Sequence, residues 1–291
     1  MIELKIDGLS VELCRPGEYY LGTRFDRAGV FRRIVKDGYV FADEWFNHTD
    51  PFRHDRVCGP SEEFVTVVFD GVAPGGLFCK PGVGLLRRPD DMPYDWFRLY
   101  EIVVPGQWLV ETGSDYAEFI HALPGWYKYT KRISLPDSCT IEISHEMNWQ
   151  GPRPLGGFFY NHNFFTFSGT PPGAGRRITF PWAPAGNWRS VYDNVRFSKD
   201  GIEFLGPVDP VNSVYCGNLH NPAGPTTCVF EISEGSHSVR VSGDMPLSHL
   251  VFWSNSRVAC PEPYMPVSLP QWQTARWTFR YTLSAESRVI I

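Results

Sequence analysis

The sequence predicts an all-β protein built as a large antiparallel β-sandwich, and three observations predict it. Proline (25 residues) and glycine (27 residues) are too frequent for a helical chain and are spread over all 291 residues. Short runs of alternating apolar and polar residues recur along the chain. Helical periodicity is nearly absent. Because large β-sandwiches reach this length as one unit, we expect a single domain over residues 1–291.

The expected strands are short runs that end in Gly, Pro, Asp or Ser, as strands joined by turns do. The N-terminal stretch MIELKIDGLSVELC reads as the first strand. Two adjacent pairs of runs predict hairpins, namely residues 126–135 with 139–149 and residues 227–233 with 236–242. The remaining runs include EFVTVVFDG, RLYEIVVPG, HLVFWS and RWTFRYTLSA, and the Trp-led segment 186–195 is expected to be a loop with one turn.

Long segments rich in Pro, Gly and aromatic residues separate these strands: 50–61, 74–94, 169–188 and 205–225. Loops of this length in a compact domain are usually functional or disordered, and the aromatic content favours a function. The chain has ten Trp and 15% aromatic residues, and ring faces suit the apolar C–H edges of sugars. A monosaccharide or sugar derivative is therefore the expected ligand, although any single Trp can equally pack in the core.

Charge, hydropathy and cysteine content exclude several classes. A net charge of −5 and a pI near 5.9 give no general surface for nucleic acid. No apolar stretch approaches the roughly eighteen residues of a membrane span. The N-terminus lacks the basic start and apolar run of a signal peptide, so we expect a cytoplasmic protein. Seven cysteines without C-x-x-C spacing predict free thiols and no metal site.

The stretch FFYNHNFFTF, residues 158–167, places a histidine between two asparagines among aromatic residues. In a strand, Asn161 and Asn163 face one side, while Tyr160, His162 and Phe164 face the other. An imidazole in an aromatic wall can exchange a proton with a sugar oxygen near neutral pH. A core histidine bonded to backbone is the alternative, but the flanking asparagines favour a site that includes His162, Asn161 and Asn163.

Three further candidates come from other segments. Glu262, in ACPEPY, lies between two prolines that stiffen the backbone, which suits a general base; a solvated loop acid is the alternative. Glu62 and Glu63, in CGPSEEF, point to opposite sides of a strand, so at most one enters a pocket, and we take Glu63 as that residue. Lys80 can donate to a sugar hydroxyl or ring oxygen, and a solvated lysine is equally compatible with its setting.

His162 and Glu262, about a hundred residues apart, predict an acid–base pair assembled by the sandwich. Sugar mutarotation needs such a pair: one group removes the proton of the anomeric hydroxyl while the other protonates the ring oxygen, and closure of the ring reverses the roles. This chemistry requires no metal and no organic cofactor, and we expect neither. The two side chains are expected to face each other across a gap one pyranose ring wide.

These segments resemble the galactose mutarotase-like (aldose 1-epimerase) superfamily, from GTRFDRAGVF at 22–31 through GPSEEF and YNHNFF to VRVSGDMPLSHLVFWSNSRVACPEPY. The resemblance implies a large antiparallel β-supersandwich and an isomerase. It implies that His162 is the general acid toward the ring oxygen and that Glu262, in its Glu-Pro step, is the base toward the O1 hydroxyl. Lys80, Arg24 and Asp209 would then orient the sugar hydroxyls.

The sequence departs from the aldose epimerase pattern at two places, where an Asn-Arg pair and a His-Gly-Gly stretch are absent. The identity of the sugar is therefore open. A phosphorylated hexose would need a cluster of arginines, for which Arg53, Arg56, Arg87 and Arg88 are candidates.

Two other functions and the oligomeric state also remain open. The same fold can serve a non-catalytic carbohydrate-binding protein, or a sugar lyase or isomerase. A lyase would need a Tyr or Lys beside an Arg that neutralises a carboxylate. The protein is expected to be a monomer or a homodimer.

Overall fold

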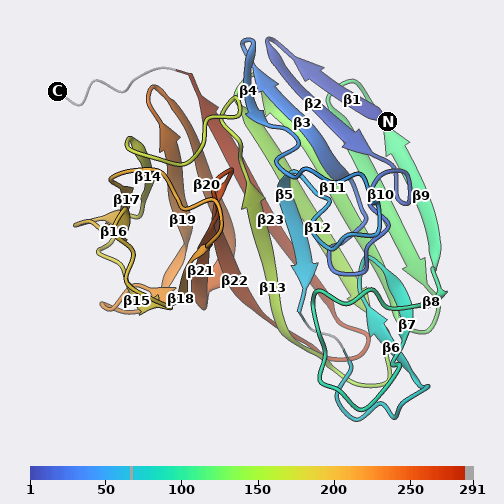
Figure 1. Cartoon of the computed structure of the whole chain (residues 1–291). Helices are drawn as coiled ribbons and strands as arrows, with labels where there is room; N and C mark the ends of the chain where they lie inside the picture. The colour runs from blue at the N-terminus through green and yellow to red at the C-terminus, as the bar shows by residue number, and fades with distance from the viewer. Residues whose placement is uncertain (66–67, 286–291) are drawn as a thin grey trace.

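The computed structural model describes residues 1–65 and 68–285, and these residues form β-strands and connecting loops without a helix. The strands make four sheets, and every pairing between neighbouring strands is antiparallel (Figure 1). The described residues include no helix long and apolar enough to cross a membrane. The predicted all-β class and antiparallel sandwich are therefore confirmed.

The two large sheets form the sandwich. The ten-stranded sheet has the order β16 (Val195–Phe197), β17 (Gly201–Phe204), β14 (Arg176–Thr179), β19 (Thr226–Glu234), β20 (His237–Leu247), β23 (Thr274–Ser284), β12 (Thr140–Trp149), β11 (Tyr127–Asp137), β10 (Tyr116–Leu123) and β9 (Gln107–Thr112). The six-stranded sheet has the order β15 (Ala185–Trp188), β18 (Val214–His220), β21 (His249–Ser254), β22 (Ala259–Leu269), β13 (Leu155–Phe164) and β5 (Gly59–Phe64).

Two small sheets complete the architecture. One has the order β1 (Ile2–Ile6), β2 (Leu9–Cys14), β3 (Val30–Lys36) and β4 (Tyr39–Ala42). The other has the order β6 (Leu77–Lys80), β7 (Gly84–Arg87) and β8 (Ile102–Val104).

Both predicted hairpins are present, as β11 with β12 and β19 with β20. The N-terminal stretch is two strands rather than one, because Asp7 and Gly8 both have positive φ and make the tight two-residue turn of a hairpin. The four segments expected to be long loops contain the short strands β6, β7, β14, β15 and β18 and the start of β5. The free-thiol prediction is confirmed for all seven cysteines.

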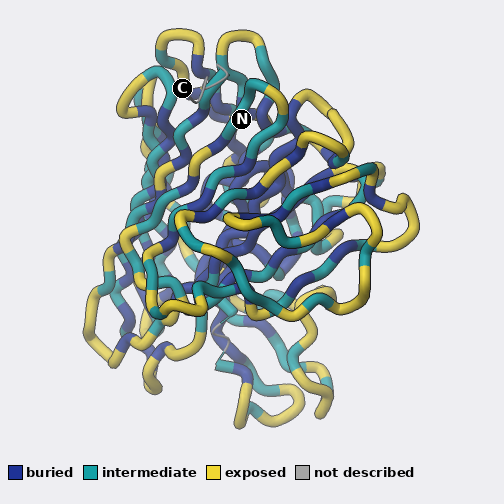
Figure 2. Tube along the Cα trace, turned by 90° about the vertical axis from the view of Figure 1, so that its left-hand side faces the viewer, coloured by how far each residue is buried: buried dark blue, intermediate teal, exposed yellow. Residues whose placement is uncertain are grey.

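The main apolar core lies between the two large sheets. Phe159 of β13 contacts Trp277 of β23 there, with ring centroids 5.0 Å apart. Buried and less buried residues alternate along β10, β11 and β12, as expected for a sheet with one face in the core. Figure 2 shows buried and less buried residues following one another along the strands near the surface.

Three neighbouring strands of the six-stranded sheet, β22, β13 and β5, instead carry runs of residues that are buried on both faces. One face packs on the ten-stranded sheet. The other is covered by a second apolar cluster, to which the loops after β2 and β4 contribute Tyr20, Phe25 and Trp45. The candidate site lies on this second face.

Candidate active site

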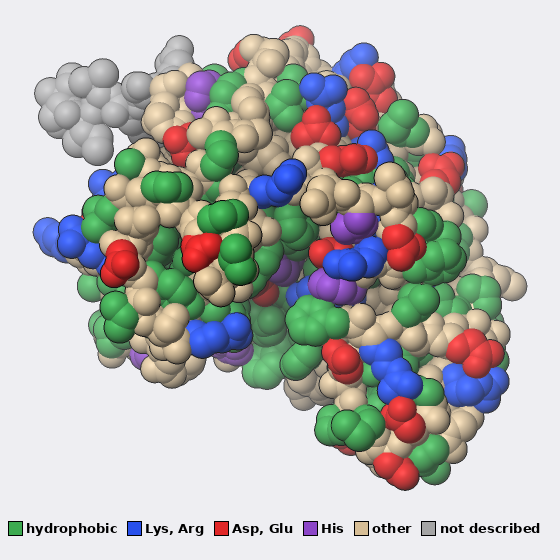
Figure 3. Space-filling model, viewed as in Figure 1, with side chains coloured by type: hydrophobic (Ala, Val, Ile, Leu, Met, Phe, Trp, Pro, Cys, Tyr) green, Lys and Arg blue, Asp and Glu red, His purple; other side chains and the backbone are tan. Residues whose placement is uncertain are grey.

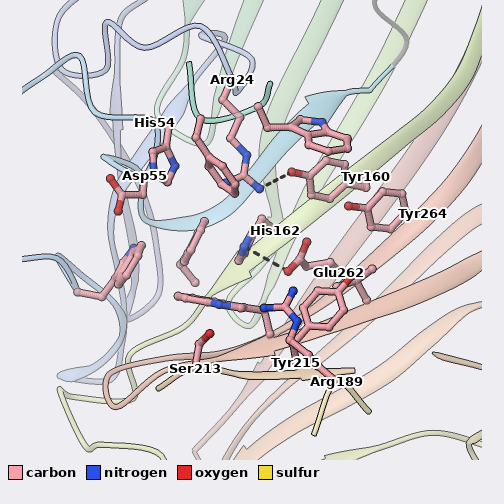
Figure 4. A pocket seen from close by; sticks show the side chains of 16 residues that line it. Arg24, His54, Asp55, Tyr160, His162, Arg189, Ser213, Tyr215, Glu262 and Tyr264 are labelled. Carbon is pink, nitrogen blue, oxygen red and sulfur yellow. Dashed lines mark hydrogen bonds and ion pairs between the residues drawn. The ribbon is translucent and has the colours of Figure 1, made fainter. Parts of the chain in front are cut away.

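The register of neighbouring strands brings the two predicted catalytic residues together. β13 pairs with β22 so that Tyr160 lies opposite Tyr264. Two residues further along β13 and two residues back along β22, His162 and Glu262 meet on the same face of the sheet. His162 Nε2 lies 3.2 Å from Glu262 Oε1 (Figure 4). The side chains are in contact rather than separated by a gap one sugar ring wide, because they extend from directly adjacent strands.

The pair lies in a cavity of about 550 Å³ whose lining is rich in aromatic residues. The ring of His162 stacks on Phe164 with centroids 3.9 Å apart, and Phe164 stacks on Trp45 at 4.9 Å. Tyr160 and Tyr264 stack on each other at 4.4 Å. The molecular surface is hollowed near the centre of the face in Figure 3, and charged side chains surround the hollow. Further aromatic residues of the lining are Trp96, Phe97, Tyr215 and Trp253.

Burial of the pair disfavours charge on both residues. The side chains of His162 and Glu262 are only 6% and 5% exposed. Burial raises the pKa of Glu262 to about 8; the nearby Arg24 charge opposes this shift and the Glu63 charge adds to it. Burial, together with the charges of Arg24 and His54, holds the pKa of His162 well below its usual 6.5. At neutral pH the pair therefore holds one proton, which resides on Glu262.

A buried carboxylate, Glu63 of β5, fixes Arg24 beside the pair. Glu63 accepts hydrogen bonds from Arg24 Nε at 3.1 Å, from the Tyr160 hydroxyl at 2.6 Å and from Lys80 Nζ at 2.6 Å. Arg24 also donates to the Tyr160 hydroxyl at 2.8 Å, and its guanidinium lies over the Phe25 ring at 4.6 Å. Two cationic side chains thus share one carboxylate, which leaves an excess of positive charge next to Glu262.

Of the predicted binding residues, Arg24 lines the cavity and five others do not. Glu63 and Lys80 are fully buried; Lys80 pairs with Glu63, and Glu63 also pairs with Arg24. Asp209 lies on an exposed turn outside the cavity, where its carboxylate accepts a hydrogen bond from the backbone N–H of Val211. The assignment of Asp209 to the site therefore has no support in the geometry.

The two asparagines face away from His162, as the alternation along a strand predicts. Asn161 points between the large sheets and donates to Glu62 and to the hydroxyl of Tyr281. Asn163 donates to the backbone carbonyl oxygen of Pro261 at 2.8 Å. Both side chains are fully buried and organise the strands rather than contact a ligand.

The four arginines considered for a phosphate do not form a cluster at the cavity. Arg53 and Arg87 pair with acidic side chains. Arg56 and Arg88 donate to backbone carbonyl oxygens. None of the four lines the cavity.

Sequence reasoning missed Arg189, Ser213 and Tyr215, which also line the cavity. The backbone N–H of Arg189 donates to the carbonyl oxygen of Tyr215 at 3.0 Å, which joins the ends of β15 and β18. The guanidinium of Arg189 lies over the Tyr215 ring at 4.2 Å. The aromatic content of the segments that contain these residues was the one signal that could have found them.

Within the described residues, no group of three or more His, Cys, Asp and Glu side chains is arranged to hold a metal ion.

No family model matches the sequence, and a search of curated proteins found no match. Solved structures match the fold over nearly the whole chain. A galactose mutarotase related enzyme from Lactobacillus acidophilus is 10% identical, with a TM-score of 0.60 and coverage of 99% of this chain and 98% of that chain. An aldose epimerase homologue from C. elegans is 13% identical, with a TM-score of 0.56 and 99% coverage of both chains.

A galactose mutarotase-like protein from Lactobacillus casei is 12% identical, with a TM-score of 0.54 and coverage of 97% of this chain and 99% of that chain. The chain has the galactose mutarotase-like fold. At these identities the likeness concerns the fold, so the roles of individual residues in this galactose mutarotase-like chain have to be argued from its own geometry.

Proposed function

We propose that the protein is an aldose 1-epimerase-like enzyme, which interconverts the anomers of a free or modified hexose by acid–base ring opening. The observation that carries this proposal is the contact between His162 and Glu262, 3.2 Å apart in an aromatic cavity. A buried pair that holds a single proton can give one proton and take another in the same step.

The spacing of the pair suits the anomeric centre of a sugar. The ring oxygen and the O1 hydroxyl are bonded to the same carbon, C1, so two adjacent catalytic atoms can reach both oxygens. One residue gives its proton to the ring oxygen as the bond between C1 and that oxygen breaks, and the other takes the O1 proton. The resulting aldehyde turns about its bond to C2, and ring closure from the other face returns both protons.

The protonation of the His162–Glu262 pair favours one direction of transfer for ring opening. Because the proton resides on Glu262, this residue would protonate the ring oxygen while the neutral imidazole of His162 accepts the O1 proton. The resemblance implies the opposite assignment. Both assignments use the same single proton, and ring closure exchanges the two roles.

The walls of the cavity supply the other requirements of a sugar site. Trp45, Trp253 and Tyr264 offer ring surfaces to the apolar edges of a pyranose. The Arg24 guanidinium, held by Glu63, can stabilise negative charge that develops on a sugar oxygen during proton transfer. The catalytic pair would thus act in a site with a fixed positive charge nearby.

The test is anomeric equilibration of freshly dissolved sugars, followed by polarimetry or NMR exchange spectroscopy. We expect Glu262→Gln and His162→Asn each to lower the enzymatic rate by about 100- to 10,000-fold, the usual contribution of a positioned acid or base. Asp209→Ala, on the exposed turn, serves as the control and should keep the wild-type rate.

Two results would contradict the proposal. One is equilibration of every sugar at the rate of the buffer alone, with binding retained, which would indicate a non-catalytic carbohydrate-binding protein. The other is a rate that survives both substitutions in the pair.

A further inference from the structure

One cation at the cavity, Arg189, forms no ion pair with any carboxylate of residues 1–65 and 68–285. Arg189 is exposed and lies just after β15, stacked on Tyr215. The neighbouring arginines in the sequence, Arg177 and Arg196, pair with Asp200 and Glu203. Among the residues that the structure describes, no carboxylate pairs with the Arg189 guanidinium, although it lines the same cavity as Glu262.

The other charges of the lining do not balance Arg189. Asp55 belongs to the lining, but its carboxylate pairs with two residues outside the cavity: it lies 3.1 Å from His48 Nε2 and 3.5 Å from Arg53 Nε. Glu262 is protonated at neutral pH for the reason given above. Arg24 already shares Glu63 with Lys80. The cavity therefore presents a net positive charge to an incoming sugar, which favours an anionic one.

We propose that Arg189 binds a carboxylate carried by the substrate, so that the preferred aldose is a uronic acid. The proposal rests on the function proposed above and specifies its substrate class. Arg189, with the Ser213 and Tyr215 side chains on the same side of the cavity, forms the subsite for the acid group (Figure 4). The anomeric carbon of the same sugar lies at the His162–Glu262 pair.

The number of free cations favours a carboxylate over a phosphate. A single guanidinium presents two parallel N–H groups, which match the two oxygens of one planar carboxylate. A phosphoryl group carries nearly two negative charges and three acceptor oxygens, and it usually meets several cations or backbone N–H groups. Here the arginines Arg53, Arg56, Arg87 and Arg88 are engaged elsewhere, so Arg189 is left to act singly.

The stacking of Arg189 on Tyr215 also fits the residues that an elimination reaction on a uronate would use. Burial raises the pKa of Tyr215, with the Glu262 charge adding to the shift and the Arg189 charge opposing it. The raised pKa favours the protonated phenol at neutral pH, in which state Tyr215 can donate a hydrogen bond to the substrate carboxylate. Elimination on a uronate is therefore an alternative reaction that the test has to exclude.

The experiment compares matched sugars that differ in one substituent: glucose, glucuronate and glucose 6-phosphate, and the corresponding galactose series. Anomeric equilibration is measured by NMR exchange and binding by calorimetry, for the wild type and for Arg189→Gln and Arg189→Lys. We expect the wild type to prefer uronates over neutral parents and phosphates. Arg189→Gln should lower that preference about 10- to 100-fold, the usual effect of losing a charge-assisted hydrogen bond. Arg189→Lys should recover it only in part, because lysine lacks the paired N–H groups.

The matched control is Arg240→Gln, an exposed arginine of β20 outside the cavity, which should leave the preference unchanged. A higher rate with neutral sugars or phosphates in the wild type, or a uronate preference that survives Arg189→Gln, would overturn the inference.

Binding separates this inference from the proposed reaction. If uronates bind through Arg189 but no anomer equilibrates faster, the carboxylate subsite stands and the proposed reaction fails. A uronate polymer then tests elimination through the ultraviolet absorbance of its unsaturated product. If the enzyme equilibrates neutral sugars and binds no uronate, the reaction stands and the carboxylate subsite is wrong.

Discussion

Two buried carboxylates on opposite faces of the six-stranded sheet have pKa values that are shifted in opposite directions. Glu62, on the core face of β5, lies 2.6 Å from Lys131 Nζ and 3.0 Å from His145 Nε2. Burial alone would raise its pKa, but the charges and hydrogen bonds of His145 and Lys131 outweigh burial and lower it to about 2. Glu262, on the cavity face of β22, has a neutral histidine as its nearest partner, and burial raises its pKa to about 8.

This difference between Glu62 and Glu262 shows that one sheet can hold a carboxylate that stabilises the core on one face and a carboxylate that can exchange a proton on the other. The core cluster surrounds Glu62 with donors and cations, so the carboxylate is ionised and its protonation does not change near neutral pH. On the cavity face the Arg24 charge only partly offsets the effect of burial on Glu262, so the proton of Glu262 is available in the pH range where enzymes work. Neighbouring residues of one strand sample both environments, since Glu62 faces the core while Glu63 faces Arg24.

Removing the cation of the core cluster should have the largest effect on stability. Lys131→Met would leave Glu62 and Asp26 without their shared lysine, and we expect the free energy of unfolding to fall by about 3–5 kcal/mol. Urea denaturation measures the change. Lys128→Met, at an exposed position of the same strand, should alter stability by less than about 0.5 kcal/mol. Equal effects of the two substitutions would show that the core pairing contributes nothing.

Glu262→Gln, unlike Lys131→Met, should increase the stability of the protein at alkaline pH. The pKa of Glu262 rises from 4.5 to about 8 on folding, so the wild type loses stability as the pH increases between these values. A glutamine does not titrate and can still donate to His162. We expect the variant to gain on the order of 2 kcal/mol over the wild type at pH 8 and little at pH 4.5. An advantage that does not change with pH would contradict the raised pKa.

The pH dependence of the reaction should show a smaller effect of Glu63. The rate of anomeric equilibration is expected to fall above pH 8, where Glu262 ionises and the pair loses its proton. Glu63→Gln removes a negative charge that helps to raise the pKa of Glu262. The alkaline limb of the pH–rate profile should therefore shift to lower pH by about 0.5–1 pH unit. Glu146→Gln, which breaks a surface pair with Arg276, is the control and should not move it. A limb that stays in place would mean that Glu63 acts only on stability.

Much of the fold could be predicted from the sequence because alternation and turn residues are local signals. The hairpins β11–β12 and β19–β20 are read directly from such runs. The short strands inside the Pro-rich and Gly-rich segments could not be read, because strands such as β6 and β15 span only four residues each. The N-terminal hairpin was missed although Asp7-Gly8 is a strong turn signal.

The candidate site was predictable in residue type but not in arrangement. The isolated histidine in an aromatic strand and the glutamate between prolines are unusual enough to single out His162 and Glu262. That they touch depends on the pairing of β13 with β22, which joins segments about a hundred residues apart and leaves no local trace. Arg189 was missed for the same reason: its proposed role depends on its position in the cavity that also contains Glu262, and this position leaves no local trace in the sequence.

The most direct test of the contrast between the two carboxylates is a carboxyl carbon NMR titration of the folded protein with labelled glutamate. Glu62→Gln and Glu262→Gln would assign the two signals. We predict that the Glu262 signal titrates near pH 8, while the Glu62 signal stays that of a carboxylate over the whole acidic range in which the protein remains folded. Titration of both signals near the ordinary value of 4.5 would contradict the account.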